Sequence, residues 1–239
     1  MNSYNAKQKT ALERKKDVYI PIETELKKVL KENEKISFWN SLNKKFEFPV
    51  VNDLLEQSYI FLPKKLKNDL LEIKELVDEL KTINHYSIAE NIILNNFETA
   101  LKDCYGDEVF LTHVDPEAGF IYENFPEPYL ILRHDMGTRK NIDLLAENDH
   151  ESIDFYESLL GNYKEPLKIE LPDDNTERTL DVGEYIAYFY PVSNKIREHE
   201  KIKQKRDIYL EIIGKIKNAL KQLEVIFTYI NKNYERDKY

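Results

Sequence analysis

The stretch KIKQKRDIYLEIIGKIKNALKQLEVIFTYI, residues 201–230, decides the fold of this 239-residue chain. The residues that recur every seven positions within it are Tyr209, Ile216, Leu223 and Ile230. Apolar residues at this spacing return to one side of a helix, and such a stripe packs against a neighbouring helix. The pattern predicts a helix from Pro191 to about Tyr234, which at 1.5 Å per residue would span roughly 65 Å.

A second stripe lies near the start of the chain, from about Ser3 to Glu34. Pro21 falls inside this segment, where it lacks a backbone N–H and crowds the preceding turn. We therefore expect one helix with a kink near residues 17–20 and no full break. The apolar residues that form its two seven-residue series are Leu12, Tyr19, Leu26, Ile22, Val29 and Ile36.

A third stripe begins at Pro63, a residue that suits the first turn of a helix. The pattern blurs over residues 84–87 and then resumes, so it predicts one helix over residues 63–105 with a bend near His85. Gly106 suits the position after the last helical turn. The residues of the stripe are Leu66, Leu70, Ile73, Val77 and Leu80.

Three long helices with matching stripes predict a mainly α fold. We expect long antiparallel helices in a coiled-coil-like bundle, with a small α+β insert in the middle of the chain. The helical frame would comprise residues 1–105 and 186–239, and the insert residues 106–185. Parallel pairing between two chains explains the same periodicity, so a homodimer through the long helices stays open.

The segment 106–185 differs in pattern from its helical flanks. EVFLTHVD, GFIYEN, PYLILRHD and PLKIELP are short runs rich in β-branched and aromatic residues, and each predicts a strand. The stretch HESIDFYESLLG, residues 150–161, predicts a short helix that ends at Gly161. In PYLILRHDMG we interpret PYLIL as a buried strand and RHDMG as the turn after it.

The same segment is strongly acidic. Residues 106–185 contain 20 Asp and Glu against 6 Lys and Arg, a net charge of −14, whereas the flanks carry a net charge of +5. Such a difference between segments indicates an interaction surface or a cation site. Well-solvated acidic loops are the equally weighted alternative.

Pairs of histidine and aspartate near the predicted strand ends raise the question of a metal or acid–base site. In a strand, residues i and i+2 point the same way, so His113 and Asp115 could face one cation. Metal-assisted hydrolysis would need three or four ligands that converge. The same residues lie at turns, where Asp and Gly shape the backbone, and we favour that interpretation. The metal candidates are His113, Asp115, His134, Asp135 and His150, and the catalytic candidates are His134, Asp135, Arg133 and Arg139.

Other kinds of chemistry are disfavoured by what the sequence lacks. Cys104 is the single cysteine, which excludes an intramolecular disulfide and a multi-cysteine zinc site. No P-loop, G-x-G-x-x-G or G-x-S-x-G motif occurs, so we expect neither nucleotide-dependent catalysis nor a serine hydrolase. We expect no cofactor, with a divalent metal as the alternative.

Tyrosines beside acidic residues mark candidate partner contacts. The chain has 16 Tyr, and several aromatic residues gather in residues 120–129, 154–157 and 184–191. Such residues anchor protein interfaces, and they also fill small β cores, so both interpretations stay open. The candidate partner-binding residues are Tyr122, Glu123, Glu127, Tyr129, Glu147, Asp149, Asp154, Tyr156, Asp173 and Asp174.

These features favour a non-enzymatic interaction, inhibitor or regulatory protein whose acidic insert binds a protein partner with a basic surface. Enrichment in Lys, Asn, Ile, Glu and Tyr indicates the A+T-rich genome of a low-GC bacterium or its phage. This suits a phage or mobile-element factor that acts for or against antiviral host defence. One alternative is a metal-dependent hydrolase or nuclease component that uses the His/Asp cluster. A second alternative is a structural coiled-coil subunit of a larger complex.

The sequence also predicts where the protein acts. The N-terminal residues show no apolar core of a secretory signal, and the longest apolar run, residues 186–192, is too short to cross a bilayer. We therefore expect a cytoplasmic protein that does not contact a membrane. Direct binding of nucleic acid is disfavoured because the acidic segment would repel phosphates.

Overall fold

The computed structural model describes residues 2–57, 62–105, 111–115, 120–124, 138–147, 167–170, 177–180 and 192–235. These residues are mainly helical, which confirms the predicted fold class at that level. The chain divides into two compact units: unit 1 comprises residues 1–83 and 204–239, and unit 2 comprises residues 84–203. Most of the insert predicted for residues 106–185 lies outside the described residues, so that insert stays a prediction.

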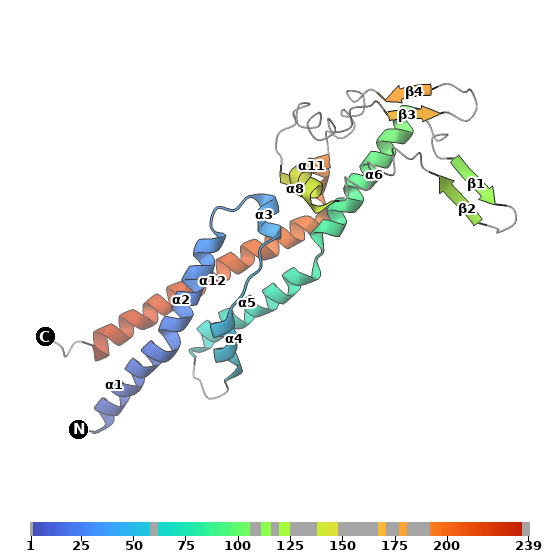
Figure 1. Ribbon diagram of the computed structural model, residues 1–239. Helices are drawn as coiled ribbons and strands as arrows, with labels where there is room; N and C mark the ends of the chain where they lie inside the picture. The colour runs from blue at the N-terminus through green and yellow to red at the C-terminus, as the bar shows by residue number, and fades with distance from the viewer. Residues whose placement is uncertain are drawn as a thin grey trace. The chain divides into compact units, whose positions relative to one another are not determined.

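Unit 1 begins with three helical segments that follow one another without a gap. They are α1 (Asn2–Arg14), the π-helical turn η1 (Lys15–Tyr19) and α2 (Ile20–Asn33) (Figure 1). Pro21 cannot donate to the turn before it, and the N–H of Ile20 bonds to the carbonyl of Lys15, five residues back. A turn widened in this way relieves the crowding by the proline ring. The local irregularity predicted near residues 17–20 is therefore a π-helical turn.

Two short helices follow that the sequence pattern did not predict, α3 (Phe38–Leu42) and α4 (Pro49–Glu56). At the start of α3, the hydroxyl of Ser37 accepts a hydrogen bond from the N–H of Asn40 at 3.4 Å. A serine at this position satisfies one of the amides that a helix leaves unpaired at its N-terminus.

A buried carboxylate from α2 caps the N-terminus of α4. Glu25 is 9% exposed, and its two carboxylate oxygens accept hydrogen bonds from the N–H groups of Val50 and Val51, both at 2.9 Å. A negative charge at a helix N-terminus is also favoured by the helix dipole. Because the acceptor and the donors lie 25 and 26 residues apart in sequence, this contact fixes α4 against α2.

The single bent helix predicted over residues 63–105 is wrong. The structure has α5 (Lys64–Thr82) and α6 (His85–Tyr105), separated by Ile83, whose ψ of 106° is extended. The side-chain oxygen of Asn84 accepts from the N–H of Ser87 at 3.2 Å, so Asn84 caps a new helix. The blurred pattern in this region thus marks the end of one helix and the start of the next.

The helix predicted from Pro191 to Tyr234 is also interrupted. The structure has α11 (Val192–Glu198) and α12 (Glu200–Tyr234), with His199 between them. The carbonyl of His199 accepts from the N–H groups of Ile202 and Lys203, both at 3.0 Å, so α12 starts its hydrogen bonding there. Downstream of this break α12 is continuous, as the heptad pattern predicts.

The core of unit 1 forms where the apolar stripes of α2, α5 and α12 meet. The predicted stripe residues of α12 are all buried, from 0% exposed at Ile216 and Leu223 to 5% at Ile230. Burial of a large aliphatic side chain contributes roughly 1.5–3 kcal/mol, so such a stripe is a dominant source of stability. The core residues with no exposed surface are Ile22, Leu26, Leu66, Leu70, Ile212, Ile216, Ala219 and Leu223.

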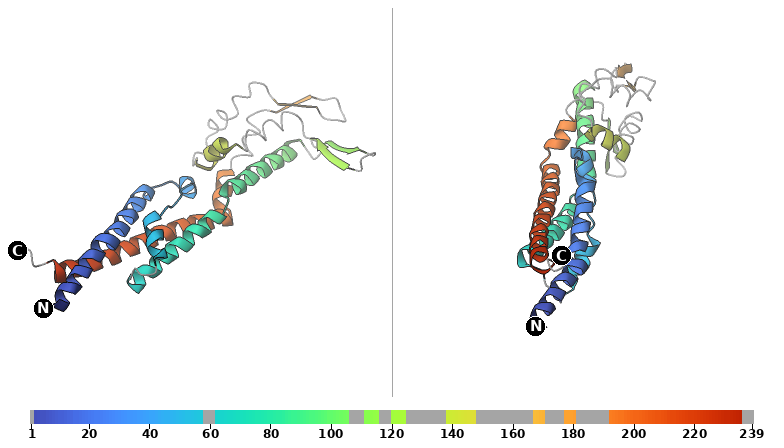
Figure 2. Two further views of the ribbon diagram at one scale, coloured as in Figure 1. Left: turned by 60° about the horizontal axis from the view of Figure 1, so that its bottom comes forward. Right: turned by 90° about the vertical axis from the view of Figure 1, so that its left-hand side faces the viewer.

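Polar contacts between α12 and α1–α2 run in opposite order along the chain. Near the chain ends, the hydroxyl of Tyr4 donates to the carbonyl of Asn233 at 2.9 Å. At the other end of α2, the hydroxyl of Tyr209 donates to the carbonyl of Asn33 at 2.8 Å. Early residues of α1–α2 therefore face late residues of α12, and Figures 1 and 2 show the two helices side by side.

The contacts between α12 and α5 follow the same opposite order. The amide of Gln204 donates to Glu79 at 3.4 Å, and further along the pair, Lys215 bonds to Glu72 and Gln222 bonds to Asp69. Hence α12 packs between α2 and α5 and runs opposite to both (Figure 1).

Two donors on α12, one turn apart, satisfy the last carbonyls of its neighbours. The hydroxyl of Tyr209 bonds to Asn33 at the end of α2, and the Nζ of Lys205 donates to the carbonyl of Ile83, just after α5, at 2.7 Å. Lys205 is only 7% exposed, and burial lowers the pKa of its ammonium group below the ordinary value. A cation beside a helix C-terminus is favoured by the helix dipole.

Within unit 2, α8 (Arg139–Glu147) packs with α6 and α11 around a small core. Buried side chains from the three helices include Ile93, Ile142 and Ile196. The turn predicted at RHDMG lies outside the described residues, but helix α8 immediately after it was not predicted.

The described residues of unit 2 also form two antiparallel hairpins. β1 (Leu111–Asp115) pairs with β2 (Phe120–Asn124), and β3 (Leu167–Glu170) pairs with β4 (Glu177–Leu180). Three of these strands lie in the stretches EVFLTHVD, GFIYEN and PLKIELP. In the parts of the chain that the structure covers, no helix is both long and apolar enough to cross a membrane.

The cap on α4 gives a stability prediction. Glu25→Ala leaves two helix amides without their acceptor, and we expect it to lower the free energy of unfolding by about 2–3 kcal/mol. Glu25→Gln keeps one acceptor and should cost about 1 kcal/mol. Denaturant titration followed by the fluorescence of the buried Trp39 measures both.

The control is Glu23→Ala, two residues away, which removes an i,i+4 ion pair with Lys27 at 2.7 Å. Exposed pairs of this kind contribute about 0.3–0.5 kcal/mol. Equal losses for Glu25→Ala and Glu23→Ala would contradict the capping role of Glu25.

Lys205 gives a pH prediction. Because its folded-state pKa is lowered, the unfolded chain binds more protons between the folded and unfolded pKa values. Stability should therefore rise as pH increases through the folded pKa and level off above the unfolded value. Lys205→Met removes this contribution, so the stability of the wild type relative to Lys205→Met should increase from pH 7 to pH 10.

Two buried tyrosines oppose this trend, because burial raises the pKa of Tyr19 and Tyr209. Their contribution falls as pH rises past the unfolded pKa, and it is common to both proteins. Comparing urea titrations of wild type and variant at each pH therefore isolates Lys205. A difference that stays flat or shrinks with pH would refute the assignment.

Candidate functional site

The proposed metal ligands are only partly within the described residues. His113 and Asp115 lie two residues apart on β1, which is the spacing of residues on one face of a strand. Their partners across the hairpin are Tyr122 and Phe120. The remaining metal candidates are His134, Asp135 and His150, and they lie outside the described residues, as does the catalytic candidate Arg133. The predicted cluster therefore stays a prediction. Among the residues that the structure describes, no group of three or more His, Cys, Asp or Glu could hold a metal ion.

Three of the predicted partner-binding residues fall on described elements. Tyr122 and Glu123 lie on β2, opposite His113 and Thr112. Glu147 is the last residue of α8, where its side chain is exposed and its carbonyl accepts from Arg197 at 3.4 Å. Those outside the described residues are Glu127, Tyr129, Asp149, Asp154, Tyr156, Asp173 and Asp174.

Arg139, a catalytic candidate, is part of a cluster around Tyr86. Its guanidinium lies 5.0 Å from the centre of the Tyr86 ring, and the Tyr86 hydroxyl donates to Asp143 at 2.8 Å. On α6 itself, the rings of His85 and Tyr86 lie 4.6 Å apart. These contacts join α8 to α6 through a cation–π interaction and a hydrogen bond. This arrangement gives Arg139 and Asp143 a structural role, which sequence reasoning missed.

The third helix of this packing, α11, is held by two basic side chains. The Nζ of Lys195 bonds to the side-chain oxygen of Asn96 on α6, which is 6% exposed. The guanidinium of Arg197 reaches the carbonyl of Glu147 at the end of α8. A cation beside the last carbonyls of a helix complements its dipole. Both contacts therefore position helices within unit 2.

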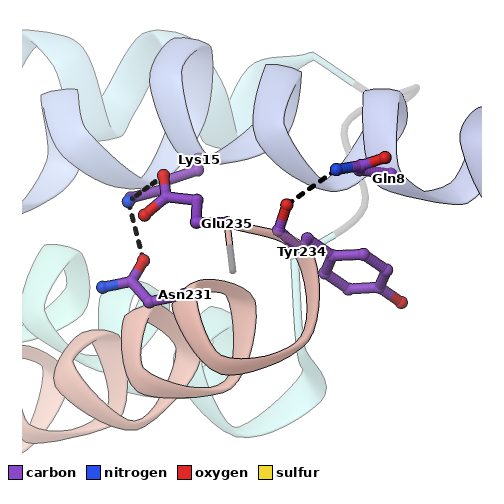
Figure 3. A network of polar contacts seen from close by, with 5 residues as sticks. All are labelled: Gln8, Lys15, Asn231, Tyr234 and Glu235. Atoms are coloured by element: carbon purple, nitrogen blue, oxygen red, sulfur yellow. Dashed lines mark hydrogen bonds and ion pairs between the residues drawn. The ribbon is translucent and has the colours of Figure 1, made fainter. Parts of the chain in front are cut away.

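A polar network closes the end of unit 1 where α1, η1 and the last turns of α12 meet (Figure 3). The Nζ of Lys15 lies 2.7 Å from both the side-chain oxygen of Asn231 and a carboxylate oxygen of Glu235. The amide of Gln8 donates to the carbonyl of Tyr234 at 2.8 Å. These bonds join residues more than two hundred positions apart and hold the two helices together at this end.

A groove lies beside this network, and we call it the terminal groove. Its larger part is a cavity of about 660 Å³ between α1, Pro63 and the last turns of α12. A second cavity of about 540 Å³ shares Pro63, Val225 and Ile226 with it and extends along α5. Both volumes fall within the range of small-molecule sites in proteins.

The terminal groove exposes apolar and aromatic side chains. Val225 is 69% exposed and Tyr229 is 60% exposed, although both lie on the helix that supplies the core of unit 1. The Tyr234 ring lies 6.2 Å from the Tyr4 ring and 6.3 Å from the Tyr229 ring. The neighbouring Tyr229 raises the pKa of Tyr234 above its ordinary value. Clustered exposed aromatic residues are a feature of protein-binding sites.

Sequence analysis missed the terminal groove because it placed every partner contact in the acidic segment. A signal was present: Val225 and Tyr229 are four residues apart, outside the heptad line of Leu223 and Ile230. They widen the apolar surface of α12 beyond what one stripe needs. Whether such an extra surface is covered depends on how far α5 reaches along α12 once the two helices pack, which the pattern does not predict.

The Tyr86 cluster gives a prediction for unit 2. Tyr86→Phe keeps the ring against Arg139 but removes the bond to Asp143, and should cost about 1 kcal/mol. Circular dichroism follows both units during denaturant titration, and Trp39 fluorescence follows unit 1 alone. The variant should shift the circular dichroism transition and leave the Trp39 transition unchanged. Equal shifts in both signals would refute a role confined to the packing of α8 on α6.

The described residues thus offer three features for function: the hairpin with His113 and Tyr122, the cluster around Tyr86, and the terminal groove. The Tyr86 cluster uses its polar groups internally, whereas the groove presents its side chains to solvent. Comparison of the chain with known proteins gives no match to a family model, to a curated protein or to a solved structure.

Proposed function

We propose that this chain is a non-enzymatic protein-interaction protein whose acidic, tyrosine-rich insert binds a basic partner surface. In this proposal, residues 106–185 form a small α+β insert, carried by long antiparallel helices in a coiled-coil-like bundle. The observation that carries the proposal is the net charge of −14 on residues 106–185 beside flanks of +5. A charge concentrated in one segment attracts an oppositely charged surface over distances comparable to the Debye length.

The residue types of the segment support a protein partner. Tyr122 and Glu123 are neighbours on β2, and the sequence places further tyrosines beside acidic residues at Tyr129 and Tyr156. In protein interfaces, buried tyrosines supply much of the affinity, while rim charges speed association and select the partner. The combination suits a surface that is recognised by both its charge and its aromatic anchors.

The sharper form of the proposal is an inhibitor. An acidic protein surface can occupy a basic site that otherwise binds nucleic acid, because both present dense negative charge to Lys and Arg. Such a protein suits a phage or mobile-element factor acting on a nucleic-acid-binding defence protein in the cytoplasm. The proposal predicts competition between this chain and nucleic acid for the same partner.

The test uses a panel of purified basic DNA- and RNA-binding proteins as probes. We expect one or more of them to bind the full chain, with affinity that falls as salt rises and with release of bound nucleic acid. The variant Glu127→Gln/Asp173→Asn/Asp174→Asn should weaken that binding about tenfold, since each lost contact with a basic surface contributes some tenths of a kcal/mol.

The matched control also removes three carboxylates, all of them exposed on unit 1, with Glu32→Gln/Glu56→Gln/Glu75→Gln. This variant should bind within about twofold of the wild type. If both variants weakened binding equally, binding would depend on the net charge of the chain and not on the insert. Binding that is insensitive to the insert variant would remove the proposal.

A further inference from the structure

The terminal groove lies along the face of α12 that α5 contacts, just beyond the point where α5 begins. Gln222 bonds to Asp69 near the start of α5, and Val225 and Tyr229 follow three and seven positions later on the same helix face. Because α5 begins at Lys64, no helix among the described residues continues along this face. This is why Val225 and Tyr229 are exposed, whereas the heptad stripe of α12 is buried as far as Ile230.

The groove has a shape that suits a helix. Its α12 wall runs from Asn218 to Tyr234, roughly 24 Å at 1.5 Å per residue. Along the larger cavity the opposite wall is α1, with Lys7 and Arg14. Along the second cavity it is the start of α5, with Lys65 and Asp69, and Ile226 lines both cavities. A helix of about four turns would match this length, and helices pack well into grooves between two others.

The lining of the groove is positively charged. Lys7 and Arg14 come from α1, Lys65 from α5 and Lys221 from α12. Asp69 is the one carboxylate among the described lining residues, and it already accepts a bond from Gln222. An occupant that presents carboxylates beside an apolar stripe would complement this lining, and one that presents lysines would be repelled.

We propose that the terminal groove binds an acidic amphipathic helix of a partner protein. The apolar stripe of that helix covers Val225 and Tyr229, in the manner of a helix seated in a groove. Its carboxylates lie near Lys7, Arg14 and the lysines at the other end of the groove. Tyr229 provides an aromatic anchor that loses its exposure to water on binding.

This inference is independent of the function proposed above. The acidic insert would bind a basic surface, whereas the groove selects an acidic helix. The two proposals involve different residues, since the groove belongs to unit 1 and residues 106–185 to unit 2. A protein with both surfaces would bridge two partners of opposite charge.

The test uses three fluorescein-labelled peptides about 18 residues long, roughly the length of the groove as helices. The first has leucine along one helical stripe and glutamate elsewhere. The second has the same composition without a stripe, and the third has lysine in place of glutamate. Fluorescence anisotropy with the full chain should show that the first peptide binds about tenfold or more tightly than either of the others.

Two single variants locate the binding. Val225→Glu places a carboxylate in the groove and should weaken binding of the first peptide about tenfold or more. The matched control is Leu210→Glu, an exposed leucine on the same helix and outside the groove lining, which is 49% exposed. It should bind within about twofold of the wild type. Both side chains are exposed, so both variants should keep the Trp39 fluorescence of the wild type.

Three results would overturn the proposal. The first is equal binding of the glutamate and lysine peptides, and the second is unchanged binding by Val225→Glu. The third is self-association of the full chain, seen by light scattering and abolished by Val225→Glu, because the occupant would then be a second copy of this chain.

Discussion

Burial of one face of α12 is the constraint on which unit 1 depends. Ile212, Ile216 and Leu223 are fully covered by α2 and α5, and the buried face returns every seven residues. The same helix donates from Lys205 and Tyr209 to the final carbonyls of both neighbours. Apolar burial thus sets which helices meet, and these two donors set where α2 and α5 stop along α12.

The long helices could be predicted because periodicity is a local signal that tertiary packing only reinforces. The breaks between helices could not be predicted in this way. Asn84 starts a new helix through its own side chain, and the break at His199 leaves the apolar pattern almost unchanged. Helix α8 offers too few turns to show a period, and it is held by contacts with α6 and α11. The role of Glu25 depends on amides 25 residues away, which no spacing in the sequence reveals.

The candidate sites could likewise be predicted only in part. Sequence charge identified an acidic segment, and the hairpin pairs its residues His113 and Tyr122, but side-chain convergence is a property of the folded chain. The terminal groove arises because α12 extends beyond the start of α5, so the sequence of α12 shows the extra apolar surface but not that it is left uncovered. Its exposed Val225 and Tyr229 look like core residues in sequence. An apolar surface that extends beyond the helix packed against it is a sequence signal for an uncovered binding surface.

Native-state hydrogen exchange along α12 tests the central claim most directly. Because α5 reaches along α12 only to about Gln222, amides from Ile208 to Leu223 should exchange slowest in unit 1. Protection should fall over residues 225–234, where α12 packs on α1 and η1. Uniform protection along the whole of α12 would show that its last turns are covered as fully as its centre. Faster exchange in residues 208–223 than in residues 225–234 would contradict the account of the core itself.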